Sequence, residues 1–276
     1  MFGKLLKHEI IATGRIMAIV YGIIAVLSAY ILGSFYLGDA SVDSDALLPS
    51  LSLILLFFVA MANVVLTIIV IMTNFQKSLY GDQGYLTFTL PVKSVSLLSA
   101  KILVSTFWYI AASLTVVVAS FLFLGAVEQD LGEEGVTLIE MLLGLYDSEM
   151  SIAVLIFQIA MVFVDFFFAA LMFTLEVCFA ITLSNTRLFQ KHHVIFTLVF
   201  SGVAAWVTSK ITSVINDLIT FGLNYDMETD ELELVVNESE MFLSYIDLLT
   251  PIVTFALTVA FFFGTNYLMK KKINLR

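Results

Sequence analysis

The sequence predicts an all-α integral membrane protein with six transmembrane helices and both termini in the cytoplasm. Two observations give this prediction: six long apolar runs, and charged residues that are sorted by sign in the segments between those runs. Hydrophobic residues make up 60% of the chain and charged residues only 13%, against about 25% charged in a typical soluble domain. A soluble fold of this composition would lack a polar surface, so we expect lipid to be its main solvent.

The apolar runs are long enough to cross a bilayer as helices. A spanning helix needs about 20 apolar residues, and it satisfies its own backbone hydrogen bonds in lipid. The runs are too continuous for barrel strands, which alternate over about 10 residues. We expect the spans at 15–37, 49–73, 102–125, 152–183, 194–215 and 248–269. Because no long polar stretch interrupts them, residues 1–276 are predicted to form a single transmembrane domain.

The distribution of charge predicts the topology. Twelve of the thirteen Lys and Arg residues lie at the termini or in the segments around 74–101 and 184–193. Acidic residues fill the alternate segments, around 39–45, 128–149 and 217–247. Lys and Arg are retained in the cytoplasm during insertion, so the basic segments are predicted to be inside. An even number of spans then places both termini on that same side.

Residues 2–14 predict an amphipathic helix that lies in the cytoplasmic interface before the first span. Lys4 and Lys7 lie beside one broad apolar face. This face is formed by Phe2, Leu5, Leu6, Ile10 and Ile11. The alternative is a plain cytoplasmic extension of the first span.

The first span carries a stripe of small residues at spacings of three and four. The stripe is formed by Ala18, Gly22, Ala25, Ala29 and Gly33. Small residues let helix backbones approach closely in lipid, so the stripe predicts a helix-packing face. A helix of the same chain and a helix of a second subunit are both possible partners.

Two carboxylates, Asp165 and Glu176, lie inside the fourth apolar run. Their spacing of eleven residues is about three helical turns, which brings them to roughly the same face. An intramembrane carboxylate is by default a candidate functional residue. The alternative is structural: one carboxylate lies at the interface and the other hydrogen-bonds a neighbouring helix. We expect Glu176 to matter more to function or assembly than any single acid of the outer segments, such as Glu231.

The basic segment 74–101 is the most informative polar part of the chain. It contains glycines for tight backbone turns, three aromatic residues, and Pro91 before the third span. An ordered cytoplasmic loop with exposed aromatic side chains suits contact with a partner protein. The alternative is a loop that folds back on its own helix ends.

The run from Tyr80 to Val92, with the sequence YGDQGYLTFTLPV, resembles a segment of bacterial type-2 ABC exporter permeases. The start of the chain, MFGKLLKHE, is similar to the start that is common in that family. The resemblance implies a dimeric plasma-membrane permease, as a homodimer or heterodimer, that pairs with a separate cytoplasmic ABC ATPase. It also implies that the loop docks onto this ATPase. The implied docking residues are Tyr80, Gly81, Asp82, Gly84, Tyr85, Leu86, Thr87, Phe88, Leu90 and Pro91.

The chain lacks the sequence motifs of an enzyme of its own. No phosphate-binding loop of the form GxxxxGK followed by Ser or Thr is present, so ATP and Mg²⁺ are expected on the partner ATPase. Neither HExxH nor GxSxG occurs. The adjacent His192 and His193 point to different helix faces and make a poor metal site. We therefore expect no catalytic residue, cofactor or metal in this chain, and no nucleic acid as a partner.

Two other functions remain open. An ion-coupled secondary transporter would use Asp165 and Glu176 as coupling carboxylates and would need no ATPase. It would also favour a repeat between the two halves, which the sequence does not show. A non-transporting assembly or sensor protein would form a stable complex without ATP-dependent flux.

The predicted topology can be tested by labelling single cysteines in a Cys178→Ala background. Cysteines at Asp43, Asp130 and Asp230 should react with an impermeant reagent in intact cells, because their segments are predicted to be outside. Cysteines at Asp82 and Gln190 should react only after permeabilisation. External reactivity at position 82 would overturn the topology.

Overall fold

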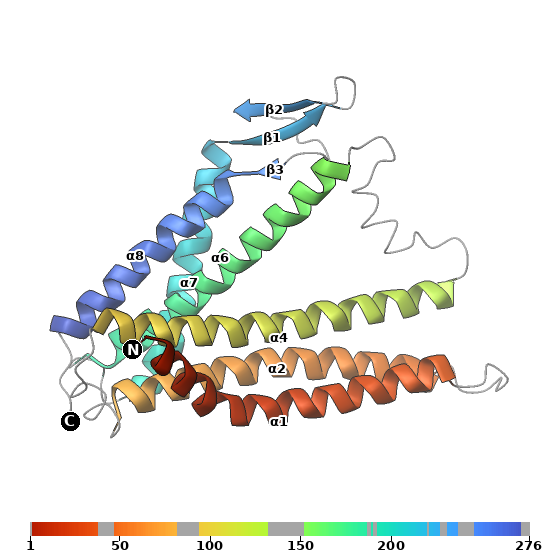
Figure 1. The fold of residues 1–276 in the computed structure, drawn as a ribbon, viewed down its shortest axis with the longest axis horizontal. Helices are drawn as coiled ribbons and strands as arrows, with labels where there is room; N and C mark the ends of the chain where they lie inside the picture. The colour runs from red at the N-terminus through yellow and green to blue at the C-terminus, as the bar shows by residue number, and fades with distance from the viewer. Residues whose placement is uncertain are drawn as a thin grey trace. The chain divides into compact units, whose positions relative to one another are not determined.

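The structure is a computed structural model that describes residues 2–37, 47–81, 94–131, 152–186, 189, 192–219, 221–226, 231–236 and 246–271. Six long helices and a small sheet make up this part of the chain (Figure 1). The helices are α1 (Phe2–Leu37), α2 (Leu47–Leu79), α4 (Ser94–Leu131), α6 (Ile152–Ser184), α7 (His193–Leu218) and α8 (Leu249–Lys271).

All six helices are long and apolar enough to cross a membrane. Each predicted span falls within one of them, to within one residue at its ends. The prediction of six helices long and apolar enough to span a membrane is therefore confirmed, and it suggests a multi-pass membrane protein. The prediction of a single domain stays a prediction.

A three-stranded antiparallel sheet between α7 and α8 departs from the predicted all-α class. Its strands are β1 (Phe221–Asp226), β2 (Glu231–Val236) and β3 (Ile246–Asp247), in the order β2-β1-β3. The pairing sets Phe221 opposite Val236 and Gly222 opposite Asp247. The acidic and apolar residues of 231–234 alternate, which favours an extended strand with two unlike faces.

The predicted interfacial helix at 2–14 forms the first turns of α1, which runs without interruption from Phe2 to Leu37. Figure 1 shows these first turns at an angle to the rest of the helix. The Thr13 hydroxyl donates a hydrogen bond of 2.9 Å to the Glu9 carbonyl, and such back-bonding often bends helices. An interfacial position for this segment stays a prediction.

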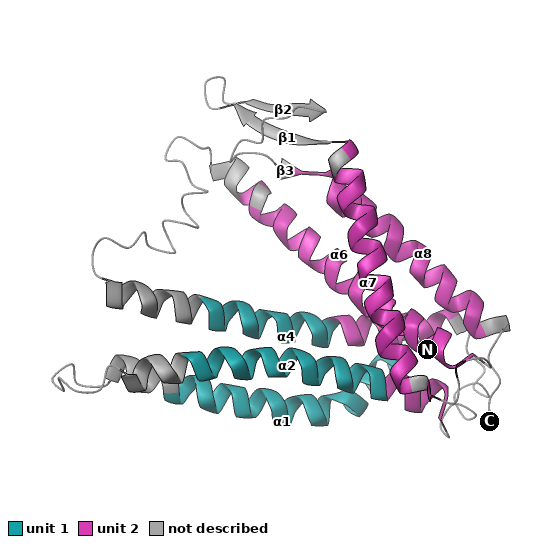
Figure 2. Cartoon of the chain, turned by 180° about the vertical axis from the view of Figure 1, so that it is seen from behind, with its two compact units in different colours: residues 1–73, 107–143 teal, residues 74–106, 144–276 magenta. Residues whose placement is uncertain are grey.

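The chain divides into two compact units, one of residues 1–73 and 107–143 and the other of residues 74–106 and 144–276 (Figure 2). In the first unit, α1, α2 and α4 run side by side. Trp108 on α4 joins α1 at two levels: its indole N–H donates to the Thr13 hydroxyl at 2.9 Å, and its carbonyl accepts from the Tyr21 hydroxyl at 3.3 Å. The Tyr21 and Trp108 rings stack with centroids 5.9 Å apart. Further along, the Asn63 amide of α2 donates to the Thr115 hydroxyl of α4 at 3.0 Å.

The second unit is built around α6, which packs along both α7 and α8. The Ser184 and Thr197 hydroxyls, 2.7 Å apart, join the end of α6 to the start of α7. The Asn216 amide donates to the Thr250 hydroxyl at 2.9 Å and joins the end of α7 to the start of α8. The three helices therefore alternate in direction. Edge-to-face pairs of phenylalanines bind α6 to α8 along its length.

The two tryptophans of the chain provide a matched test of this packing. Trp108→Phe should lower the free energy of unfolding by about 0.5–1.5 kcal/mol, because the ring is kept but the bond to Thr13 is lost. Trp206→Phe should change it by less than about 0.5 kcal/mol, because the Trp206 side chain is 64% exposed. Thermal unfolding of both variants in dodecyl maltoside checks the difference. Equal effects would contradict a structural role for the Trp108–Thr13 bond.

Candidate functional site

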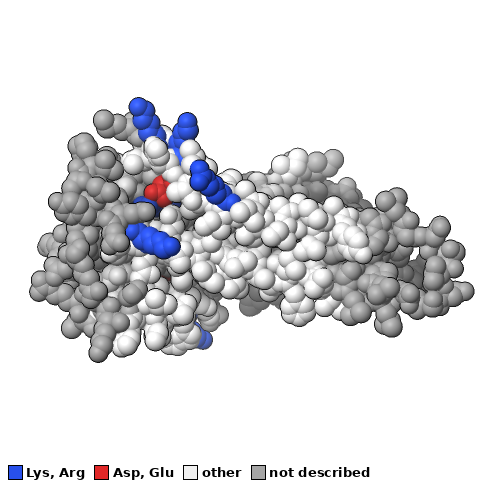
Figure 3. Space-filling model, turned by 90° about the horizontal axis from the view of Figure 1, so that it is seen from below, with Lys and Arg blue, Asp and Glu red and all other residues white. Residues whose placement is uncertain are grey.

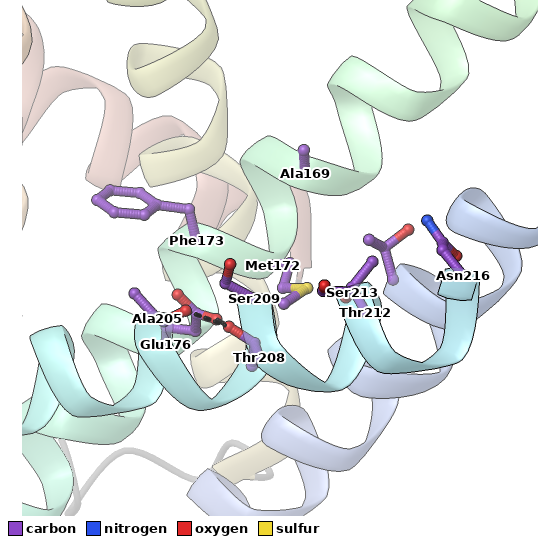
Figure 4. A pocket seen from close by; sticks show the side chains of 11 residues that line it. Ala169, Met172, Phe173, Glu176, Ala205, Thr208, Ser209, Thr212, Ser213 and Asn216 are labelled. Atoms are coloured by element: carbon purple, nitrogen blue, oxygen red, sulfur yellow. Dashed lines mark hydrogen bonds between the residues drawn. The ribbon is translucent and has the colours of Figure 1, made fainter. Parts of the chain in front are cut away.

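The second unit contains an open cavity of about 370 Å³ between α6, α7 and α8 (Figure 4). On α6 it is lined by positions spaced three or four residues apart, which belong to one helix face. The same spacing brings a row of Ser, Thr and Asn side chains on α7 to the cavity. The lining residues are Ala169, Met172, Phe173, Glu176, Ala205, Thr208, Ser209, Thr212, Ser213, Asn216 and Thr254.

Among the described residues, Glu176 is the only charged side chain that lines the cavity. Its side chain is 3% exposed, and its Oε1 atom accepts a hydrogen bond of 2.6 Å from the Thr208 hydroxyl. Figure 4 shows these two side chains pointing toward one another from facing helices. The distance is typical of a hydroxyl that donates to an ionised carboxylate. Within the described part of the chain, Glu176 forms no ion pair.

The Thr208 hydroxyl can serve either charge state of Glu176. Besides the carboxylate, it lies 3.0 Å from the Ala204 carbonyl and 3.1 Å from the Ala205 carbonyl. Towards an ionised Glu176 it donates its proton. Towards a protonated Glu176 it accepts, and its own proton turns to a backbone carbonyl of α7. The site can therefore gain or lose a proton without leaving the carboxyl group unpaired.

Asp165 does not share this site, although it lies on the same helix. It is half-buried, its Oδ1 atom has no hydrogen-bond partner in the described residues, and it does not line the cavity. It interacts electrostatically with Asp247, which caps the start of α8 by accepting from the Leu249 N–H at 2.8 Å. The two predicted carboxylates thus separate, with Asp165 toward the sheet end of α6 and Glu176 against α7.

Tyr80 opens the predicted docking segment and binds its own chain. Its hydroxyl donates a hydrogen bond of 2.9 Å to the Thr182 hydroxyl near the end of α6. Burial raises the pKa of the Tyr80 phenol above its usual range, so the phenol stays protonated and can donate. At this residue the structure agrees with the alternative of a loop that folds back on helix ends.

Gly81 follows the end of α2 at a point where the backbone comes too close for a side chain. Its N–H donates to the Gln76 carbonyl at 2.9 Å, and a Cβ atom there would lie 2.9 Å from the Lys77 carbonyl oxygen. The remaining predicted docking residues fall outside the described residues. These are Asp82, Gly84, Tyr85, Leu86, Thr87, Phe88, Leu90 and Pro91.

The small-residue stripe of α1 does not face the other helices of its unit. Ala18, Gly22, Ala25 and Ala29 are exposed, and no described atom lies within 4 Å of a Cβ placed on Gly22. For Gly33 only the helical backbone is described. The packed face of α1 is a different one, formed by Thr13, Met17 and Tyr21. Within this unit the stripe is left free for lipid or another helix.

Basic side chains lie near one end of α1. Lys4, Lys7 and Arg15 are exposed there, whereas the helix carries no charged residue from Ile16 to Leu37. Figure 3 shows blue side chains on one part of the surface and a broad uncharged surface beyond them. Among the described residues, no group of three or more His, Cys, Asp or Glu side chains could hold a metal ion.

Sequence reasoning found Glu176 but missed its partners. The signal that could have found them is a polar helix face within an apolar run, with side chains at spacings of one, three or four residues. The face is formed by Thr208, Ser209, Thr212, Ser213 and Asn216. Comparison with known proteins finds no matching family model, no matching curated protein and no matching solved structure.

The bond between Thr208 and Glu176 can be tested by removing the hydroxyl. Thr208→Val should lower the free energy of unfolding by about 1–3 kcal/mol, because a buried carboxyl group loses its hydrogen-bond partner. The control is Thr212→Val, one turn further along α7, where the threonine makes no hydrogen bond to Glu176. Thermal unfolding in detergent measures both. An equal effect of the two variants would show that the bond does not stabilise the fold.

Proposed function

We propose that the chain is the membrane-spanning permease subunit of an ATP-driven ABC exporter in a bacterial plasma membrane. In this function a separate cytoplasmic ABC ATPase holds ATP and Mg²⁺, and the segment from Tyr80 to Pro91 docks onto it. The observation that carries the proposal is the resemblance of residues 80–92 to a segment of bacterial type-2 ABC exporter permeases. The hydrogen bond between Tyr80 and Thr182 adds a structural link to it. It ties the start of the docking segment to the helix that lines the cavity.

The arrangement of the second unit supports a common cytoplasmic end. The end of α2 meets the end of α6 through Tyr80 and Thr182, and the end of α6 meets the start of α7 through Ser184 and Thr197. Because the helices alternate in direction, the basic end of α8 lies at this same end. The acidic segment around the sheet lies at the opposite end. This separation agrees with the retention of basic residues in the cytoplasm.

The same contacts suggest how a push on the docking segment would reach the cavity. Thr182 and Glu176 lie less than two turns apart on α6, and Glu176 is bonded to α7 through Thr208. A displacement of Tyr80 would therefore bear directly on the helix that carries the buried carboxyl group. The ATPase would bias a two-state arrangement of these helices by binding one state more tightly.

The exposed stripe of α1 supports a second permease subunit. Helix pairs in lipid associate through small residues that allow close backbone contact. Since this stripe does not pack within its own unit, a second copy or a related chain is the partner that we propose for it. The plasma membrane then holds two permease subunits for two ATPases.

Ion-coupled secondary transport is the second candidate, favoured by one observation. Glu176 is buried, and its Thr208 partner can serve both of its charge states. This is a property that a proton-coupling residue needs. Transport that persists without any ATPase would favour this candidate.

The docking segment is tested with the permease and its candidate ATPase purified together. Tyr85→Ala should weaken binding by about 1–3 kcal/mol, because aromatic residues often anchor interfaces. Asp82→Lys should disturb docking through its charge and leave insertion of the helices intact. Tyr80→Phe should retain binding and lower substrate-stimulated ATP hydrolysis, because it removes only the link to Thr182.

Co-purification reports binding, and the rate of ATP hydrolysis reports coupling. Full binding and full coupled hydrolysis in both Tyr85→Ala and Asp82→Lys would rule out this segment as the transmission element. If Tyr80→Phe hydrolyses ATP at the wild-type rate, the contact between Tyr80 and α6 is not needed for coupling.

A further inference from the structure

The described lining of the cavity in the second unit offers hydrogen-bond acceptors and no cation. It contains no Lys, Arg or His side chain. The second carboxylate oxygen of Glu176 accepts no hydrogen bond from a described residue. At the other end of the lining, the Asn216 Oδ1 atom is buried without a partner, while its amide N–H₂ is engaged by Thr250. Such a lining favours a ligand that donates several hydrogen bonds and carries positive charge.

The hydroxyl groups of α7 add further hydrogen-bond acceptors for a positively charged ligand along the cavity. Ser209, Thr212 and Ser213 lie between Glu176 and Asn216 on the face shown in Figure 4. Hydroxyl oxygens accept hydrogen bonds and so leave a positive ligand well solvated. An ammonium group has three N–H donors and no acceptor, which matches this set of atoms.

The volume of the cavity and its apolar lining favour an organic ligand over an inorganic ion. A volume of about 370 Å³ lies within the range of small-molecule sites. An inorganic cation such as Ca²⁺ needs six to eight oxygens in one shell, whereas this cavity supplies one carboxylate. Met172, Phe173 and Ala205 add apolar surface beside the polar row. An organic cation with an apolar body uses both parts.

We propose that the cavity between α6, α7 and α8 binds a primary ammonium group carried on an apolar chain, with the Glu176 carboxylate as its counter-charge. The Thr208 hydroxyl holds the carboxylate in place, and the α7 hydroxyls next to Glu176 accept the remaining N–H donors. Met172 and Phe173 contact the apolar chain. This binding requires no ATPase, so it can be tested whether or not the chain is an exporter subunit.

The test is equilibrium dialysis of radiolabelled n-hexylammonium against the purified chain in dodecyl maltoside, with protein-free micelles as the blank. We expect saturable binding with about one ligand per chain, and no saturable binding of n-hexanol, which has the same chain length without the charge. Glu176→Gln should weaken binding at least about 30-fold, because it removes the counter-charge from a buried pair. Asp165→Asn removes a carboxylate of the same helix outside the cavity and should bind as wild type.

A second pair of variants tests the site without altering Glu176. Ala205→Phe places a large ring in the cavity and should abolish binding, whereas Val203→Phe adds the same ring to a lipid-facing position that is 53% exposed. Size-exclusion chromatography shows that each variant is folded and monodisperse. No saturable binding to the wild type, equal binding of n-hexanol, or unchanged binding in both Glu176→Gln and Ala205→Phe would overturn the proposal.

A primary ammonium group on an apolar chain occurs both in aminolipids and in water-borne amines. Added phosphatidylethanolamine distinguishes these two ligands. Saturable displacement of n-hexylammonium assigns the site to an aminolipid headgroup. Binding that persists at saturating phosphatidylethanolamine assigns it to a water-borne amine.

Discussion

The absence of water in the hydrocarbon core is the constraint on which the rest of this structure depends. Each backbone polar group must be satisfied within a helix, and each polar side chain must find a partner in protein. Many Ser and Thr residues meet this demand by donating to a carbonyl three or four residues earlier, as Thr67, Thr174 and Thr258 do. The few that bond to another helix are therefore the informative ones. They join Trp108 to Thr13, Asn63 to Thr115, Tyr80 to Thr182, Ser184 to Thr197, Thr208 to Glu176, and Asn216 to Thr250.

Two of these interhelical bonds, Thr208–Glu176 and Tyr80–Thr182, hold the residues of the second unit to which we assign a function. Among the described residues, the buried Glu176 has no basic partner, and membrane helices retain such a costly arrangement mainly where a ligand, a proton or a pathway needs it. Its only described partner is a hydroxyl that serves both charge states. Tyr80 ties α6 to the end of α2. Helix α6 therefore connects the segment that begins at Tyr80 with the cavity. A permease needs such a link, because its ATPase acts far from the ligand.

Much of the helical architecture could be predicted because it follows from local sequence. Lipid imposes a length on each apolar run, so the six spans are read directly from hydrophobicity. The cavity could not be read in this way, because Thr208 and Glu176 lie 32 residues apart and Tyr80 and Thr182 lie 102 residues apart. The sequence also could not show which helix packs against the α1 stripe. Small residues favour close packing, but they do not determine the partner helix. At 231–236, the alternation of acidic and apolar residues was compatible with a strand. The strand forms because this segment pairs with β1.

The central claim is that the segment from Tyr80 to Pro91 contacts an ATPase. The most direct measurement is photo-crosslinking in intact cells, with p-benzoylphenylalanine in place of Tyr85 and, as a control, in place of Leu138 of an acidic segment. The account predicts an adduct at position 85 with a protein that contains a phosphate-loop ATP site, and no such adduct at position 138. No ATPase adduct at position 85, or an equal one at position 138, would contradict it.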